Sequence, residues 1–485
     1  DNGGDMSQQD GLYWKQAPPL IARYEIRGTL ELTSPMSLSN GDSEGITDIL
    51  LRRDLLSRQP QLPGSTLAGA LAGYLNAYLP HGAAMNRSLI ERLFGENNPV
   101  ASQQSWLFIE DSLGTERGVE FRDGVSIEDS LRVAADGKKY DTELLAAGST
   151  FPLVFSFWEP ANPGQGVQPG ELRHLLGIAL QALAEGHIPL GGRKRRGLGE
   201  CQVTNWQVYR YDMAQPAGLL GWLEQDRGQP QKGGTILEML EVDAPVKPQA
   251  DLCRLTATLQ IVDSLLIHAA GVGGEADMVH LRNHAGQPIV SGTSLAGALR
   301  ARARRIARLL NGQHGDALIN ELFGQEMDEE PGKQKPRASR LWISENVIQP
   351  NSAIPEQVQS RVKLDRFTGG SFPGALFDQQ AQWGGQFGLE LTVRRQTARD
   401  ELAQAHVGLL LLLLKDLWTG DLPLGGEASV GRGRLAGLSA TLQWGGTQWE
   451  IAPTRTGITI TPDPARLQAA VDAIRSWTPG GAQDE

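Results

Sequence analysis

Residues 62–71 read LPGSTLAGAL, and residues 290–299 read VSGTSLAGAL. Three further landmarks recur in the same order: LFG at Leu93 and Leu322, SWLFIED at Ser105 against SRLWISE at Ser339, and PLGG at Pro189 and Pro423. The members of each pair lie about 230 residues apart. A repeat of this length predicts two copies of one domain.

The size and composition of the chain agree with this prediction. With 485 residues, the chain exceeds the length at which a single core usually stops growing. Its 40% hydrophobic and 21% charged content is ordinary for a globular protein, while 58 Gly and 27 Pro indicate many turns. The longest apolar run, 407–414, is far shorter than the roughly 20 residues that a membrane span needs, so we expect a buried helix there.

Two classes of site are disfavoured by residue type. Cys201 and Cys253 are the chain's two cysteines, too few for a disulfide framework or a cysteine-rich zinc site, and we expect them to serve packing. The eight histidines include no HExxH motif.

The first residues, DNGGDMSQQDG, do not resemble a secretory signal, so we expect a cytoplasmic protein.

Each copy opens on a strand of alternating character, IRGTLEL at 26–32 and LTATLQI at 255–261. A polar loop, a helix, LFG, a second strand, a variable insertion, another helix and a glycine-rich turn follow. We expect Ser65 or Thr66 to cap the first helix of the first copy, and Thr293 or Ser294 that of the second. This order favours an α+β fold with antiparallel sheets.

The expected domain boundaries follow from the repeat and from composition. The predicted divisions are a mobile N-terminus at 1–20, a first module at 21–211, a Pro/Gly/Gln-rich linker at 212–250, a second module at 251–453 and a mobile C-terminal extension at 454–485.

The glycine-rich turns read GGRKRRGLGE at 191–200 and GGEASVGRGR at 425–434. A P-loop needs Lys and Ser/Thr after its final glycine, but Leu198 follows Gly197 and Arg432 follows Gly431. The Rossmann fingerprint is absent as well. Glycines allow close backbone approach and an anion-binding nest of amides. The two remaining interpretations are a loop that binds a ligand through its backbone and a tight turn that enters the last strand.

Basic residues cluster although the net charge is −11, and a local basic face is what matters for binding a polyanion. Arg300, Arg304 and Arg308 share a face at helical spacing, which indicates either a solvated face or a surface for phosphates. The clusters are Arg52, Arg53 and Arg58; residues 193–196; and Arg300, Arg302, Arg304, Arg305 and Arg308.

The set of PGSTLAGAL, LFG and GGxxxxGxG resembles the RAMP superfamily of CRISPR ribonucleoproteins over roughly 21–208 and 252–449. Within it, the chain looks like a tandem fusion of two type III effector backbone subunits, most like the double backbone subunit of type III-D systems. The resemblance implies ferredoxin-like (RRM-like) modules that line up along a CRISPR guide RNA. It also implies a thumb hairpin in each insertion, around 124–148 and 364–385.

In catalytic members of that family, an Asp in the loop before the PGS helix directs cleavage of target RNA. The matching stretches ITDILLRRD and EADMVHLRN give Asp48 and Asp277, and Asp42, Glu44 and Glu275 are the nearest competitors. Such a carboxylate can hold a divalent cation, expected to be Mg²⁺ or Mn²⁺, or orient a 2′-hydroxyl for in-line attack. The expected products are a 2′,3′-cyclic phosphate and a 5′-hydroxyl.

RNA contacts are expected from the glycine turns, the basic clusters and the helix N-termini, which direct amides toward phosphates. The expected RNA-binding residues are Arg52, Arg53, Ser65, Thr66, Gly191, Gly192, Arg193, Lys194, Arg195, Arg196, Gly197, Thr293, Ser294, Arg300, Arg304, Gly425, Gly426, Gly431 and Arg432.

Three functions remain open on the sequence. The first is an RNA-guided endoribonuclease subunit with two cleaving aspartates, and the second is an architectural subunit that binds RNA without cutting it. The third is a guide-processing nuclease with a His-centred acid/base site near His268 and His280. The expected partners are guide RNA, complementary target RNA, other RAMP backbone subunits and the large signature subunit, with no membrane.

Overall fold

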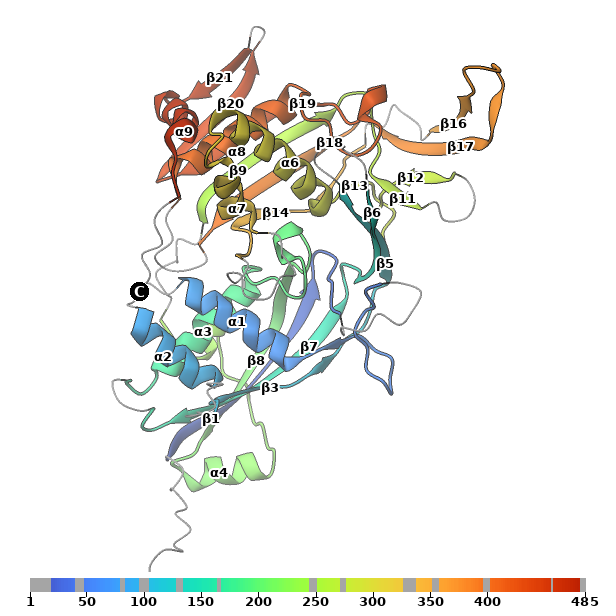
Figure 1. The fold of residues 1–485 in the computed structure, drawn as a ribbon. Coiled ribbons are helices and arrows are strands. Elements are labelled where there is room, and N and C mark those ends of the chain that lie inside the picture. The colour runs from blue at the N-terminus through green and yellow to red at the C-terminus, as the bar shows by residue number, and fades with distance from the viewer. Residues whose placement is uncertain are drawn as a thin grey trace, which may run out of the picture.

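The protein folds as two modules of matching elements (Figure 1). Each module has its own hydrophobic core, and the architecture is α+β with mainly antiparallel sheets. The computed structural model describes residues 19–39, 48–78, 83–95, 104–127, 134–163, 167–243, 251–270, 276–325, 337–350, 357–395, 402–454 and 457–479.

The main sheet of the first module has the order β3-β7-β1-β8. In β1, Tyr24, Ile26 and Leu30 alternate with more exposed residues, so one face enters the core beneath α1 and α3. The elements of this module are β1 Leu20–Leu32, β2 Gln61–Leu62, α1 Gly64–Tyr78, α2 Ala83–Phe94, β3 Leu107–Ile109, β4 Ser112–Leu113, β7 Thr150–Pro160, α3 Glu171–Ala184, the 3₁₀ turn η1 Lys194–Arg196 and β8 Cys201–Asp212.

The second module repeats the order as β14-β18-β9-β19 and continues it with β20 and β21. Its elements are β9 Asp251–Ile261, β10 Ser264–Leu265, β11 His268–Ala270, β12 Met278–His280, β13 Ile289–Val290, α6 Gly292–Leu310, α7 Gly315–Phe323, β14 Leu341–Ile343, β15 Asn346–Val347, β18 Gln386–Arg394, α8 Gln404–Trp418, the 3₁₀ turn η2 Ala428–Val430, β19 Leu435–Trp444, β20 Thr447–Thr454, β21 Gly457–Thr461 and α9 Ala465–Ser476.

The predicted C-terminal extension is part of the second module. Strands β20 and β21 add two strands to the edge of the sheet, and α9 packs against α8. Leu467, Ala470 and Ile474 of α9 enter the core. The predicted boundary at 453 falls within β20, and the apolar residues of α9 recur at helical spacing and bury one face of the helix. Residues 1–18 and 480–485 of the predicted mobile ends lie outside the described part of the chain.

The insertions predicted as thumbs are β-hairpins. The first pairs β5 Val119–Ile127 with β6 Ala134–Leu145, and the second pairs β16 Gln357–Leu364 with β17 Ser371–Trp383. Both begin before the predicted starts at 124 and 364. Figure 1 shows β16 and β17 projecting away from the second sheet, whereas β5 and β6 run toward the second module.

The predicted linker 212–250 is largely folded onto the first module. It contains α4 Pro216–Leu223 and α5 Ile236–Met239, and Ile236 enters the first core. Helix α4 lies over the other face of the sheet, where the guanidinium of Arg23 sits 3.8 Å from the ring centroid of Trp222. The Pro/Gly/Gln-rich composition predicted a linker here instead of a helix, because Pro216 occupies the first turn of α4, where proline is compatible with a helix. Residues 244–250 lie outside the described part.

The helix caps differ from the predicted ones. Ser291 is the N-cap of α6, and its hydroxyl oxygen accepts the amide N–H of Ser294 at 3.3 Å. Thr293 and Ser294 therefore lie inside the first turn, because α6 begins at Gly292.

Helix α1 likewise begins before its predicted caps. The amide of Gly64 donates to the Asp111 carboxylate at 2.8 Å, and Ser65 and Thr66 lie in the first turn. The carboxylate comes from beyond β3, a tertiary contact that local sequence does not reveal.

Two composition-based expectations are confirmed by burial. Cys201 and Cys253 are buried and not disulfide-bonded, and burial raises the pKa of the Cys201 thiol to about 12. The apolar run 407–414 lies in the mostly buried α8. Within the described ranges, no helix combines the length and apolarity required to cross a bilayer.

Candidate functional site

Asp48 lies at the edge of the first hairpin. The residue after it, Ile49, pairs in parallel with Thr142 of β6, which brings the loop against the hairpin. The Asp48 Oδ2 atom then accepts the backbone N–H of Asp141 at 2.9 Å. The side chain stays exposed, so the carboxylate is both oriented and accessible.

Asp277 has the same arrangement in the second module. Met278 of β12 pairs in parallel with Gln379 of β17, and the Asp277 Oδ2 atom accepts the backbone N–H of Asp378 at 2.9 Å. Asp277 is also exposed. Two loop aspartates predicted from the sequence thus occupy equivalent positions, each fixed by the second strand of its hairpin.

The hairpin aspartates Asp141 and Asp378 were not predicted. The Oδ1 atom of each is buried without a hydrogen-bond partner among the described residues. Removal from water and the neighbouring carboxylates of Asp123 and Asp48 raise the pKa of Asp141. The residue opposite Asp141 across the hairpin is Asp123, but the one opposite Asp378 is Ser360. The first site therefore has a third carboxylate, Asp123, which pairs with the Lys139 ammonium at 3.2 Å.

A weak sequence signal marked these residues. Each hairpin aspartate follows an aromatic residue, as Tyr140-Asp141 and Phe377-Asp378. The guanidinium of Arg193 lies 4.7 Å from the ring centroid of Tyr140, which brings a predicted RNA-binding cation near the first site.

The competing carboxylates Asp42, Glu44 and Glu275 lie outside the described residues. Within the described ranges, no group of three or more His, Cys, Asp or Glu side chains is arranged to hold a metal ion.

His280 is a structural residue. Its Nδ1 atom accepts the N–H of Ile267 at 3.2 Å, so Nε2 carries the proton and donates to the carbonyl of Ile289 at 3.0 Å. Burial lowers the pKa of this side chain to about 4. The imidazole is neutral and fully engaged, which argues against His280 as the centre of the predicted acid/base site.

The glycine turns are tight because their own modules crowd them. A Cβ added at Gly191 would lie 2.4 Å from the Ser37 carbonyl oxygen, and one at Gly425 would lie 2.4 Å from that of Leu266. The amide of Gly192 donates to the Ser37 carbonyl at 2.8 Å, and that of Gly426 donates to the Leu266 carbonyl at the same distance. These glycines thus have a packing role in both modules.

The family model of the RAMP superfamily matches residues 29–202 and 258–436, one region in each module. The chain belongs to the RAMP superfamily. Membership implies a CRISPR-associated role with RNA binding. No curated protein matches the chain.

The first glycine turn also forms the junction between the two RAMP modules. A Cβ added at Gly197 would lie 2.2 Å from the Glu345 amide nitrogen of the second module. Conversely, a Cβ added at Gly292, the first residue of α6, would lie 2.1 Å from the Arg196 carbonyl oxygen. Backbone meets backbone here, and side chains larger than hydrogen are excluded on both sides.

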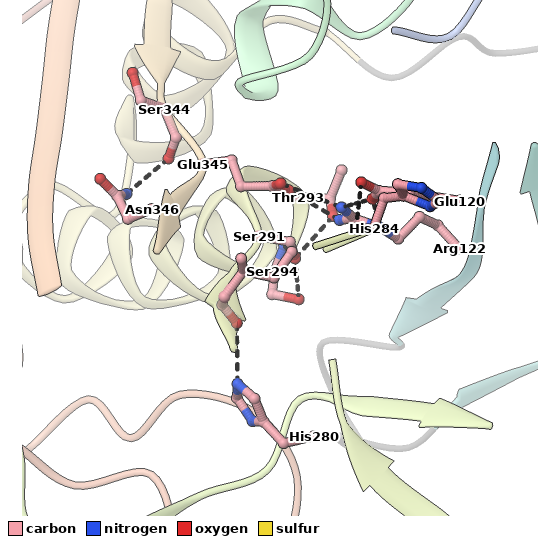
Figure 2. A network of polar contacts seen from close by, with 11 residues as sticks. Glu120, Arg122, His280, His284, Ser291, Thr293, Ser294, Ser344, Glu345 and Asn346 are labelled. Carbon is pink, nitrogen blue, oxygen red and sulfur yellow. Dashed lines mark hydrogen bonds and ion pairs between the residues drawn. The ribbon is translucent and has the colours of Figure 1, made fainter. Parts of the chain in front are cut away.

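A buried ion network completes the junction. Arg122 of β5 donates to the Glu345 carboxylate at 2.8 Å and also pairs with Glu120. The amide of His284 donates to Glu120 at 2.9 Å. Figure 2 shows these four residues converging from the two modules. Burial alone would lower the pKa of Arg122, but its bonds to Glu345 and Glu120 raise the pKa above its usual value.

The basic residues of the first RAMP turn point partly into this junction. The Arg195 guanidinium lies 5.6 Å from the ring centroid of Trp342 in β14. Burial, followed by repulsion from neighbouring cations, lowers the pKa of both Lys194 and Arg196. Three predicted RNA contacts therefore lie where the second module is seated.

The other predicted arginines have protein partners. Arg52 donates to Gln61 at 3.1 Å, and Arg53 pairs with Glu116 at 2.7 Å. Arg432 is buried and pairs with Glu427 at 2.8 Å.

The arginines of α6 also contact their own module. Arg300 donates to the Gly324 carbonyl at 3.1 Å, and Arg304 pairs with Asp316 at 3.8 Å. Arg308 pairs with Asp316 as well, at 2.9 Å. The arginine face of α6 is therefore held by hydrogen bonds and ion pairs within its own module.

Proposed function

We propose that this chain is a subunit of a type III CRISPR RNA-guided effector complex, most similar to the double backbone subunit of type III-D systems. It binds the guide RNA backbone and cleaves complementary target RNA once in each module, with Asp48 and Asp277 as the catalytic residues. The proposed partners are guide RNA, target RNA, other RAMP backbone subunits and the large signature subunit.

The sheet topology supports a ferredoxin-like module in each half. The chain order strand, helix, strand, strand, helix, strand gives the spatial orders β3-β7-β1-β8 and β14-β18-β9-β19, with the first strand central and the last strand beside it. The hairpins β5–β6 and β16–β17 interrupt this pattern at the same point, which supports their role as thumbs.

The observation that carries the proposal is the matched holding of the two loop aspartates. In each module a hairpin amide fixes Oδ2 at 2.9 Å while the side chain remains exposed. A carboxylate oriented in this way can accept a proton from, or align, a 2′-hydroxyl for attack on the adjacent phosphodiester. The 2′ oxygen bonds to phosphorus to form a 2′,3′-cyclic phosphate as the P–O5′ bond breaks, and the 5′ oxygen takes a proton from water to leave as a 5′-hydroxyl.

A divalent cation is compatible with these donors but not as a tightly held ion. Carboxylate oxygens suit Mg²⁺ or Mn²⁺, yet the described residues offer no larger ligand group. We therefore infer that Asp48 and Asp277 would each hold an ion in their own module, with oxygens of the RNA as the other ligands. Its contribution when bound would be to neutralise charge that develops at the cleaved phosphate.

The alternative function is architectural. An exposed loop aspartate that accepts one amide also has the geometry of a turn-stabilising residue. In that case the chain would bind guide RNA and neighbouring subunits without cutting. The guide-processing alternative is disfavoured by the buried, neutral His280.

The decisive experiment is target-RNA cleavage by the assembled complex with guide RNA and magnesium. We expect Asp48→Ala and Asp277→Ala each to slow the formation of one specific product by 100-fold or more, because loss of a catalytic group commonly costs ~10²–10⁴ in rate. The double variant loses both cuts and keeps guide binding.

Matched controls are Asp54→Ala in the first module and Asp365→Ala in the second. Both are half-buried loop aspartates that accept local amides, Asp54 from Ser57 at 2.7 Å and Asp365 from Phe367 at 3.0 Å. They should leave both cuts intact. Cleavage at every position by the double variant would reject the catalytic assignment and leave the architectural function.

A further inference from the structure

The two candidate sites share their aspartates but receive a guanidinium from different elements. In the first module, the residue before the hairpin aspartate is Tyr140, and Gly124 lies opposite it across the hairpin. In the second module, the equivalent Phe377 lies opposite Arg361. Directly opposite residues of an antiparallel pair are neighbours on one face, so Arg361 and Phe377 share a face of the second hairpin.

The first module supplies its guanidinium from the glycine turn. Arg193 is the N-cap of the 3₁₀ turn η1, and its guanidinium lies 4.7 Å from the ring centroid of Tyr140. Within the described ranges, Arg193 pairs with no carboxylate. A Cβ added at Gly124 would lie 2.1 Å from the Cζ atom of Tyr140, so the ring occupies the space of an opposite side chain. The cation beside this ring therefore comes from the turn and not from the hairpin.

The second module has a carboxylate where the first has Arg193. Glu427 is the N-cap of η2, and both residues have a left-handed backbone, with φ of 52° for Arg193 and 59° for Glu427. The Glu427 carboxylate pairs with Arg361 at 3.1 Å and with the buried Arg432 at 2.8 Å. Burial alone would raise the pKa of Glu427, but the hydrogen bond from Gln379 and the two guanidiniums lower it. Arg361 is thus present at the second site but held by an ionised carboxylate.

Each guanidinium lies beside the point where the hairpin holds the loop aspartate. The aromatic residue of each hairpin immediately precedes the residue whose amide binds that aspartate at 2.9 Å. The side chain of Arg361 is 31% exposed and Arg193 is half-buried, so an RNA strand can reach both. The planar fork of an arginine matches the two free oxygens of a phosphodiester. The observed placement therefore suits a phosphate bound next to the loop carboxylate.

We propose that Arg193 at the first site and Arg361 at the second position the target-RNA phosphodiester, and that Glu427 competes with the RNA for Arg361. The guanidinium binds the non-bridging oxygens, orients the phosphate beside the loop aspartate and offsets the charge that develops during attack. Because Arg361 is shared with Glu427, the second cut is slower than the first. This inference rests on the proposed function for the cleavage reaction and adds the residues that set the rates of its two cuts.

Single-turnover cleavage of target RNA by the assembled complex, with each product resolved, tests the proposal. Arg193→Ala should slow the first cut alone and Arg361→Ala the second cut alone, each by at least about 10-fold. Arg193→Lys and Arg361→Lys keep the charge but not the planar fork, and they should recover part of the rate. Glu427→Gln removes the competing charge and should speed the second cut toward the rate of the first.

A second measurement separates this inference from the proposed function. A target with 2′-deoxy residues at the two cut positions lacks the attacking hydroxyls, so its binding can be measured whether or not the complex cuts. Arg193→Ala should reduce the slope of log affinity against log salt concentration by about 0.7–0.9, the value for one phosphate contact. The controls Arg87→Ala and Arg475→Ala remove exposed arginines that pair with local carboxylates, and they should change neither slope nor rate.

Three results would overturn the proposal. Unchanged rates and salt slope in both arginine variants, while Asp48→Ala and Asp277→Ala still abolish their cuts, would leave the cleavage reaction intact and remove the arginines from it. Equal slowing of both cuts by either arginine variant would indicate lost assembly instead of positioning. A slower second cut in Glu427→Gln would show that the carboxylate orients Arg361 and does not compete with RNA for it.

Discussion

The turn at 193–197 and the turn at 427–431 follow one backbone path in two settings. The first is covered by the second module, with Gly197 against Glu345, and the second is open at Val430. Glycines just after each turn are needed in both settings because Gly199 and Gly433 lie against the carbonyls of their own modules.

The difference explains why glycines recur while positive charge does not. The glycines satisfy packing that each module repeats, so both copies keep them. The cations at 193–196 belong partly to a junction that exists once, where Arg195 lies over Trp342. A repeated motif can therefore mark repeated packing, and a charge found in one copy can mark a contact made once.

Breaking the junction should have the largest effect. Arg122→Ala leaves Glu120 and Glu345 buried without their cation, and we expect a loss of about 3–5 kcal/mol in the free energy of unfolding. Calorimetry should resolve a separate transition for each module. Arg87→Ala, which removes an exposed pair with Glu91, should cost no more than about 0.5 kcal/mol. Equal effects of the two variants would contradict a tight junction.

A pH effect from a buried histidine is expected in the second module. His280 occupies the position of Leu51 in the first, and its pKa is lowered to about 4 from a usual 6.5. Below pH 6.5 the histidine is protonated in the unfolded chain but stays neutral in the folded one. The free energy of unfolding is therefore highest above pH 6.5 and decreases as the pH falls toward 4. At pH 5 the loss is about 2 kcal/mol.

The measurement is urea unfolding at pH 7 and pH 5 for wild type, His280→Gln and the control His187→Gln. His280→Gln should reduce the pH dependence, whereas His187, which is exposed, should leave it unchanged. The same pH dependence in all three proteins would show that His280 is not the buried base described above.

The comparison of the two turns is sharpest in a matched pair of glycine substitutions. Gly197→Ala and Gly431→Ala carry the same strain from positive φ, but only the alanine at 197 meets a neighbouring backbone. We expect Gly197→Ala to be less stable than Gly431→Ala by about 1–3 kcal/mol in urea unfolding. Indistinguishable stabilities would mean that the junction yields at no cost.

Much of the architecture was predictable because it rests on periodic patterns. The two-module α+β organisation followed from the repeat, and the opening strands followed from alternation in LTATLQI and its counterpart. The paired positions of Asp48 and Asp277 followed from a family motif. Local patterns of this kind are readable because neighbouring residues create them.

The remainder depended on contacts between distant residues. Asp141 and Asp378 lie far along the chain from the aspartates that their amides hold, and Asp111 reaches α1 from beyond β3. The helices at 216–223 and 465–476 were missed because proline-rich or terminal context outweighed their apolar spacing. The junction was unpredictable because nothing local pairs Arg122 with Glu345.

The buried network of Arg122 and Glu345 fixes the position of one module relative to the other. With such a junction, the distance between the two loop aspartates is set by the polypeptide and not by the RNA strand that it binds. Under the proposed function, the two cuts would then fall at a constant interval on any target, whatever its sequence.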